Sequence, residues 1–532
     1  MRFAFLLLVA AACGAPSSPR AVRAFVSGAG VDVSWEGAPS ASVELYDFDA
    51  RAPRGEAVQG QGGHAFLPGS AVGVRVGGTE LSLVSAGASG GDGSAWQLFS
   101  PADFSGGELH AKFTLASGEK LGVLLLNAGG RDGAEASVAA RGTAEVVSAQ
   151  RASEAAPHAG VQDLGEPANA AALAAPERVQ SRRSFCVVPG LDFSQRLQRP
   201  AQLLLTTEHA EFYVDADDVS HYPPGFLESL GNAFEERVWP SDLAAFGAPT
   251  DVDGNGRVAV LLTHVLGEHL NGGWLIGYFG RSDLLHARDP DCSSSGSNHG
   301  EIIYLNDVAN GLANGYTADA LADTVYPATL AHELQHLIGF GRRGGAAEET
   351  FIDEGLSKLA EDLAGYGWNA AAGRSEGSLY LSRLTGDVRG YDGRSLTLWE
   401  GDPVGNYQGT HSFFRYFADQ DAGFVERVLA GRGVAGLTAA LGRPLPRAMA
   451  EWATALLLSN EPGAPYGFQG AAWSPLHQRL RALQARAPGA VTLRPDGLAA
   501  FVTGAGEGQA EIVVHSSEAV PPHVVVVRSR SL

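Results

Sequence analysis

Two histidines of this chain are separated by three residues, and a glutamate follows the first. The run is His332-Glu333-Leu334-Gln335-His336. Pro327 suits the first turn of a helix, and an apolar stripe of Leu330, Leu334, Leu337 and Ile338 predicts that the run is helical. On a helix the two imidazoles are one turn apart on one face, where they can bind one Zn²⁺ at about 2.0–2.1 Å. Glu333 then stands beside the metal as a candidate general base for water.

A catalytic zinc needs a third protein ligand and one open position. Glu354 lies on a second amphipathic pattern, whose apolar positions are Phe351, Leu356, Leu359 and Leu363. The glycine-rich residues 341–345 allow this second helix to fold back on the first. Glu349 is the competing acid, but it precedes the helical pattern. We therefore expect His332, His336 and Glu354 to be the metal ligands.

Two further residues are candidates for stabilising the oxyanion of a tetrahedral intermediate. Tyr407 and His411 precede the apolar run 413–417, so a helix there can direct either toward the zinc. A packed aromatic ring and a surface imidazole are the alternatives. Asp323 is a candidate for orienting a ligand imidazole. Residues 301–305 form either an edge strand for an extended peptide or an ordinary core strand.

A second metal is considered at residues 251–256, where Asp251, Asp253 and Asn255 alternate with small residues. This spacing matches the first half of a calcium-binding loop. The twelfth position is Leu262, so the segment is not an EF-hand, and any calcium needs a distant acid to close its site. An Asx turn before a strand is the alternative. For the loop containing Asp289, Asp291 and His299, a solvated loop is favoured over a metal site.

Composition and charge restrict the class of protein. The 532 residues carry a formal charge of -21, from 59 acidic and 38 basic side chains, which disfavours binding to nucleic acid or to anionic lipid. Residues 1–12 have the charged, apolar and small-residue regions of an export signal. The next residue is Cys13. If Cys13 is lipidated, the protein is an outer-membrane lipoprotein; if it is not, the protein is secreted. We expect a monomer whose membrane contact is limited to this anchor.

Without Cys13, two of the three cysteines remain, Cys186 and Cys292. An even number of cysteines in an exported protein predicts a disulfide bond. Two buried thiols are the alternative.

The predicted fold class is α+β and multidomain. Short alternating segments between residues 24 and 147 predict a β-sandwich-like N-terminal domain, and residues 148–180 have the composition of a linker. Residues 181–485 are expected to form the catalytic domain, with strands at 257–263 and 301–305, a helix at 224–238 that Pro240 ends, and a mainly helical second half. Residues 486–532 return to alternating strands.

The segments 332–338 and 351–362 together resemble the hyicolysin family of zinc metallopeptidases, within the gluzincins. Weaker matches are residues 206–215, 246–256 and 407–416, so the resemblance covers about residues 185–460. It implies a gluzincin-like fold, ligands at His332, His336 and Glu354, a catalytic Glu333, and hydrolysis of protein or peptide substrates. Asp353 stands where the gluzincin pattern often has Asn. The alternative function is a surface lipoprotein with an inactive peptidase-like body that binds a partner through its N-terminal β domain.

Overall fold

The computed structural model describes most of the chain, in several stretches. Backbone alone is described for short strands between residues 20 and 89. Side chains are described in residues 96–130, 132–142, 181–189, 195–267, 275–367, 395–399, 406–407, 409–457, 488–503 and 506–529. The predicted export signal 1–12, Cys13 and the predicted linker 148–180 lie outside the described residues. Among the described helices, none combines the length and apolar character that a bilayer crossing requires.

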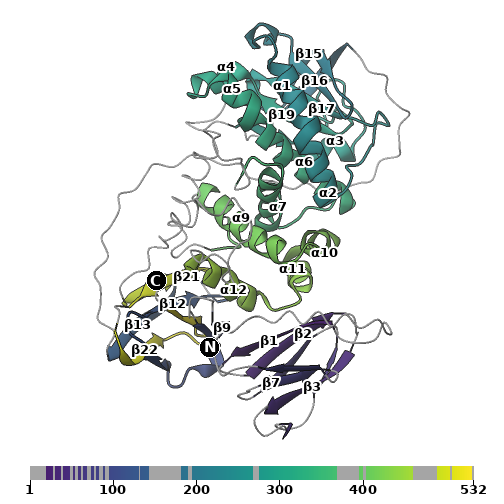
Figure 1. The fold of residues 1–532 in the computed structure, drawn as a ribbon. Helices are drawn as coiled ribbons and strands as arrows, with labels where there is room; N and C mark the ends of the chain where they lie inside the picture. Colours follow the sequence, from purple (N-terminus) through teal and green to yellow (C-terminus); the bar gives the residue numbers. More distant parts are fainter. Residues whose placement is uncertain are drawn as a thin grey trace.

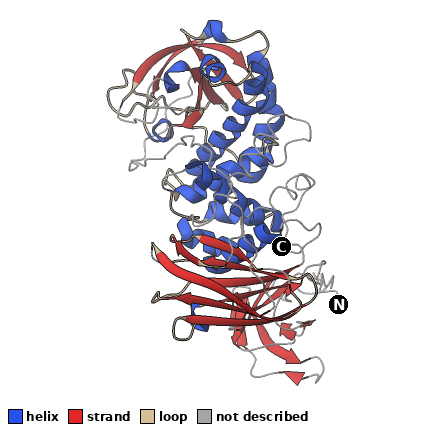
Figure 2. Cartoon of the chain, turned by 90° about the vertical axis from the view of Figure 1, so that its left-hand side faces the viewer, coloured by secondary structure: helices blue, strands red, loops and turns tan. Residues whose placement is uncertain are grey.

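Figure 1 and Figure 2 show β-rich regions at the two ends of the molecule, with the later helices of the chain, from residue 350 on, between them. One of these regions includes a largely antiparallel sheet from the first 82 residues. Its main strand order is β1-β2-β6-β5-β3-β7-β8, with β4 paired to β3. Its strands are β1 (Arg20–Ser27), β2 (Gly30–Glu36), β3 (Ser40–Asp47), β4 (Ala52–Pro53), β5 (Val58–Gln61), β6 (His64–Pro68), β7 (Gly73–Val76) and β8 (Thr79–Ser82).

Beside that sheet lies a sandwich of two sheets built from both halves of the sequence. The five-stranded sheet has the order β21-β12-β23-β10-β9, and the four-stranded sheet has the order β11-β22-β13-β20. The strands from the first half are β9 (Ala88–Ser89), β10 (Ala95–Phe99), β11 (Glu108–Leu115), β12 (Lys120–Leu126) and β13 (Ala134–Gly142). Those from the second half are β20 (Ala490–Leu493), β21 (Leu498–Val502), β22 (Gly508–Ser516) and β23 (His523–Ser529). Strands from residues 88–142 and from residues 490–529 thus share both sheets.

Strand β12 shows why the two segments need each other. Alternate residues Val123 and Leu125 face the second sheet, while Leu124 and Leu126 face the helices, and all four are fully buried. The helix on that outer face is α12 (Leu445–Leu458), whose Trp452 belongs to the same core. A strand buried on both faces needs hydrogen-bonded neighbours at both edges, and β21 and β23 provide them.

The part of the chain that contains His332 and His336 is built on a six-stranded mixed sheet. Its strand order is β14-β15-β16-β17-β19-β18. Its strands are β14 (Arg182–Val187), β15 (Leu197–Thr206), β16 (Ala210–Asp215), β17 (Val258–Thr263), β18 (Gly277–Phe279) and β19 (Ile302–Asn306). β16, β17 and β19 are parallel, and the other pairs are antiparallel. Since β19 lies between β17 and β18, residues 301–305 form a core strand, and the edge-strand alternative is wrong.

Helices cover one face of this sheet. They are α1 (Phe226–Ala233), α2 (Trp239–Phe246) and α6 (Tyr326–Arg342), and their apolar side chains share a core with alternate residues of the parallel strands, such as Val260 and Ile303. Short helices α3 (Arg281–Leu285), α4 (Val308–Ala313) and α5 (Ala318–Ala320) lie in the connections. The remaining helices follow α6: α7 (Thr350–Leu363), α9 (Pro403–Gln420), α10 (Phe424–Ala430), α11 (Gly433–Leu441) and α12.

Pro240 does not end the helix that begins at Phe226, so that prediction is wrong. A π-helical turn at Phe234–Val238 precedes it, in which the Trp239 N–H donates to the Phe234 carbonyl, and α2 then continues to Phe246. The wider turn accommodates a ring that lacks an N–H donor. A π turn also precedes α6, the helix of His332 and His336: it spans Leu321–Val325, directly before the turn that contains Pro327.

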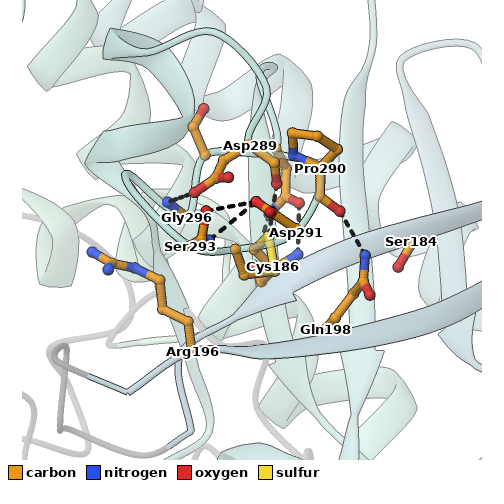
Figure 3. The surroundings of a disulfide bond; sticks show 12 residues. Ser184, Cys186, Arg196, Gln198, Asp289, Pro290, Asp291, Ser293 and Gly296 are labelled. Atoms are coloured by element: carbon orange, nitrogen blue, oxygen red, sulfur yellow. Dashed lines mark hydrogen bonds between the residues drawn. A yellow bond between two sulfur atoms is a disulfide. The ribbon is translucent and has the colours of Figure 1, made fainter.

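The predicted disulfide bond between Cys186 and Cys292 is confirmed. It joins β14 to the loop that precedes β19, 106 residues later in sequence (Figure 3). Around it, Gln198 donates to the Pro290 carbonyl, and Asp289 accepts the backbone N–H of Gly296. Asp289 and Asp291 therefore serve as hydrogen-bond acceptors that shape this loop.

Candidate metal centre

Helices α6 and α7 bring the three expected ligands together. Nε2 of His332 lies 3.1 Å from Oε2 of Glu354, and Nε2 of His336 lies 3.6 Å from the same oxygen. Donor atoms of the three residues all lie within 4.8 Å of one another. Two imidazole nitrogens and one carboxylate oxygen at this spacing fit the protein ligands of a catalytic zinc, which keeps its fourth position for water or substrate.

The other ring nitrogens of the two histidines face acids. Nδ1 of His332 lies 2.8 Å from Oε1 of Glu361, and Nδ1 of His336 lies 3.3 Å from Oδ2 of Asp353. When Nδ1–H donates to a carboxylate, the lone pair of a neutral imidazole is on Nε2. In this tautomer the Nε2 lone pairs of both neutral rings would face the same point as the Glu354 carboxylate, as metal binding requires.

Sequence reasoning did not find Glu361. It follows Glu354 by seven residues, which is two helical turns, so both acids lie on the face of α7 that meets α6. That spacing is the signal available in the sequence. Lys358 lies 2.5 Å from the second oxygen of Glu361 and balances its charge.

The buried acids and histidines of this site change each other's pKa. Burial disfavours the ionised form of Glu354, but the two histidines outweigh it and lower the pKa of Glu354 to about 2. Burial also opposes charging of His332, but Glu354 and Glu361 raise its pKa to about 9. The acids thus stabilise positive charge at the point where the three donor atoms meet. A divalent cation supplies that charge while leaving both imidazoles neutral.

Glu333 lies beside the two imidazoles and is 7% exposed. Burial raises the pKa of this carboxyl, while the nearby histidines counteract the increase. A carboxylate with a raised pKa is a better proton acceptor than a solvated one.

Helix α9 places Tyr407 and His411 differently. The ring of Tyr407 is 6.0 Å from that of His332, and it also contacts Trp399. His411 is fully buried one turn further along, with Nε2 3.4 Å from Oδ2 of Asp362. Burial lowers the pKa of His411, an effect that Asp362 opposes. Of the two candidates, Tyr407 is the one beside a ligand imidazole.

The approach of α9 depends on a glycine next to the ligand. A Cβ atom at Gly355 would lie 2.3 Å from Cδ2 of Phe414, so no larger residue fits between α7 and α9 without a shift. The residue after Glu354 thus sets how closely the helix of Tyr407 approaches the metal centre.

Two acids considered from sequence lie elsewhere. Glu349 is the N-cap residue of α7, and its side chain accepts the backbone N–H of Val434. Asp323 accepts the hydroxyl of Ser229. The orienting role considered for Asp323 falls to Glu361 and Asp353.

Carboxylate oxygens of Asp251, Asp253 and Glu301 also lie within 4.8 Å of one another. Glu301, which precedes β19, is thus a distant acid close to the loop. Asn255 is engaged differently: its amide donates to Asp253, and its oxygen accepts the backbone N–H of Arg257. Calcium at this loop stays a prediction.

Comparison with known proteins points to the same chemistry. No family model matches the chain. Over 201 residues, 36% of its length, the chain is 25% identical to the neutral metalloprotease ShpI of Staphylococcus hyicus. It spans 42% of the length of that relative. The chain is thus a distant relative of a metalloprotease.

Proposed function

We propose that this chain is an exported zinc-dependent endopeptidase, with His332, His336 and Glu354 as ligands and Glu333 as general base. The observation that carries the proposal is the convergence of two Nε2 atoms and one carboxylate oxygen, with both Nδ1 atoms facing acids. The similarity to a metalloprotease supports it.

Each protein group has a defined task in peptide hydrolysis. When bound, zinc acts as a Lewis acid that polarises the scissile carbonyl and acidifies water. The Glu333 carboxylate accepts the proton of the attacking water and then delivers it to the leaving amine. Tyr407 donates a hydrogen bond to the oxyanion that forms on the substrate carbonyl. Glu361 and Asp353 keep the two ligand imidazoles oriented.

The substrate is a protein or peptide that binds in extended form. β18 pairs with β19 alone among the described strands and contacts α6, which carries both ligand histidines. Its other edge offers backbone groups to which a peptide strand can be added. The net charge of -21 disfavours nucleic acid as a substrate.

Export is supported by the disulfide bond, since such bonds persist in oxidising compartments. We propose that residues 1–12 are a signal peptide and that the mature protein is either an outer-membrane lipoprotein anchored at Cys13 or a secreted protein. Mass spectrometry of the mature N-terminus tests this. A diacylglycerol adduct on Cys13 supports the anchor, and an unmodified N-terminus beyond Cys13 supports secretion instead.

The test of the activity compares Glu333→Gln with Glu349→Gln, a matched change of an exposed acid outside the centre. Casein hydrolysis and bound zinc are measured in both variants and in the unchanged protein. We expect Glu333→Gln to retain one zinc and lose hydrolysis, and Glu349→Gln to retain both. Zinc-loaded protein without hydrolysis before any substitution would instead favour the binding protein with an inactive body.

A further inference from the structure

Acids and histidines also gather where the three parallel strands end. Asp215 ends β16, and Asp218 and His221 follow it closely, while His264 comes directly after β17 and Asp307 directly after β19. The carboxyl ends of parallel strands meet at one edge of the sheet, which is a common place for ligands. None of these residues belongs to the centre on α6 and α7.

Asp218, His221 and Asp307 form one of two sets of possible metal ligands at this edge, the other being Asp215, Asp218 and His264. Their donor atoms lie within 4.8 Å of one another. Nδ1 of His221 lies 2.7 Å from Oδ2 of Asp307 and 3.7 Å from Oδ1 of Asp218. The side chain of His221 is 38% exposed, whereas both acids are buried, so the set opens to solvent on the histidine side.

Asp215 has other partners and is not a ligand candidate. Its two oxygens accept hydrogen bonds from Arg199 at 2.6 and 2.9 Å, and Thr263 donates to one of them at 2.8 Å. His264 supports the set from outside, because its Nδ1 lies 2.8 Å from Oδ1 of Asp218 and its backbone N–H donates to the other oxygen. Ligand carboxylates usually have such supporting hydrogen bonds.

Asp307 supplies the second observation. Its side chain has no exposed surface, and Oδ1 has no hydrogen-bond partner among the described residues. The buried hydroxyl of Tyr222 lies close to this carboxylate, and burial together with Asp307 raises the pKa of Tyr222. An unsatisfied, fully buried carboxylate oxygen is costly, and a bound cation removes that cost.

We propose that Asp218, His221 and Asp307 bind one divalent transition cation of the Zn²⁺ or Mn²⁺ type. An imidazole nitrogen with two carboxylate oxygens suits such metals, whereas Ca²⁺ prefers oxygen ligands alone. The cation would join the segment after β16 to Asp307, whose Oδ2 also accepts the Ala309 N–H and so caps α4. This role is structural, and it does not depend on the proposed peptidase activity.

The experiment uses the full chain with His332→Ala and His336→Ala, so that the catalytic centre contributes no metal. After chelator treatment, zinc binding is measured by isothermal titration calorimetry and by metal analysis. We expect one equivalent to bind and to raise the melting temperature, and millimolar Ca²⁺ neither to compete nor to replace it. No binding, or an adventitious ion that Ca²⁺ displaces, would overturn the proposal.

Variants in that background locate the ion. Asp307→Asn keeps an acceptor for the α4 cap, and His221→Asn changes a partly exposed residue, so circular dichroism should show both variants folded. We expect zinc affinity to fall at least tenfold in each. Asp217→Asn is the matched control, because Asp217 is an exposed acid of the same segment that binds Arg199. Unchanged affinity in both ligand variants, or equal loss in the control, contradicts the assignment.

Discussion

Nδ1 of His332 lies 2.8 Å from Oε1 of Glu361, two helical turns beyond Glu354. Helix α7 thus contributes twice to the proposed metal centre: Glu354 lies beside the Nε2 atoms of both histidines, and Glu361 faces the other ring nitrogen of His332. Lys358, one turn before Glu361, balances the charge of the second acid.

Replacing Glu361 with Gln should weaken zinc binding by about 10–100-fold, the usual effect of removing an acid that orients a ligand histidine. The amide still accepts a hydrogen bond but no longer stabilises a charged or metal-bound imidazole. Competition with a chromophoric chelator measures the affinity, and Glu349→Gln serves as the control. Equal affinities in the two variants would remove Glu361 from the centre.

Tyr407→Phe should preserve the ring contacts with His332 and Trp399 while removing the hydroxyl. We expect kcat to fall about 10²–10³-fold, as for the loss of one oxyanion donor, with zinc content and KM little changed. Steady-state kinetics on a fluorogenic peptide provide the measurement. A variant as active as the unchanged protein would show that another group stabilises the oxyanion.

His411→Asn distinguishes the second helical candidate. Because His411 is buried against Asp362, we expect its replacement to lower the melting temperature by disturbing the pair that Asp362 forms with Arg415. Activity per folded molecule should be retained. Loss of kcat without loss of stability would instead assign His411 to catalysis.

Removing the disulfide bond by Cys186→Ser and Cys292→Ser should cost about 2–5 kcal/mol of unfolding free energy. The bond closes a loop of 106 residues that contains β15, β16, β17 and β18. Urea unfolding measures the change, with the unchanged protein as the control. A double variant as stable as the control would mean that the two cysteines contribute little to the fold.

Asp283 should make stability depend on pH. Burial raises the pKa of this carboxyl to about 7, although the Asn298 N–H and the Tyr304 hydroxyl, both donors to it, oppose the increase. The unfolded chain loses this proton near pH 4, before the native protein does, so the contribution of Asp283 is full below about pH 4 and declines up to pH 7.

The comparison is with Asp283→Asn, which cannot ionise. Between pH 4 and pH 8 the unchanged protein should lose roughly a few kcal/mol of unfolding free energy that the variant does not lose. Urea unfolding at several pH values measures it. A difference that is constant with pH would mean that Asp283 ionises with an ordinary pKa.

The spacing of residues in the sequence predicted the central residues of the proposed metal site but not the residues around them. His332, Glu333 and His336 lie within two helical turns, so their common face follows from the period of the helix alone. Glu361, His221 and Asp307 are brought to their partners by packing between distant segments, which no local pattern specifies. The prediction that Pro240 ends the helix was wrong for a related reason. The π turn before Pro240 depends on how α1 and α2 pack on the sheet.

Because β12 pairs with both β21 and β23, the sandwich depends on strands from both ends of the sequence. The sandwich cannot close until residues 490–529 have been synthesised, although its first strands are made several hundred residues earlier. These early strands stay unpaired at these edges until the last strands are made, and the closing strands complete the assembly. A protease cut between residues 148 and 180 would therefore leave two fragments that remain bound to each other.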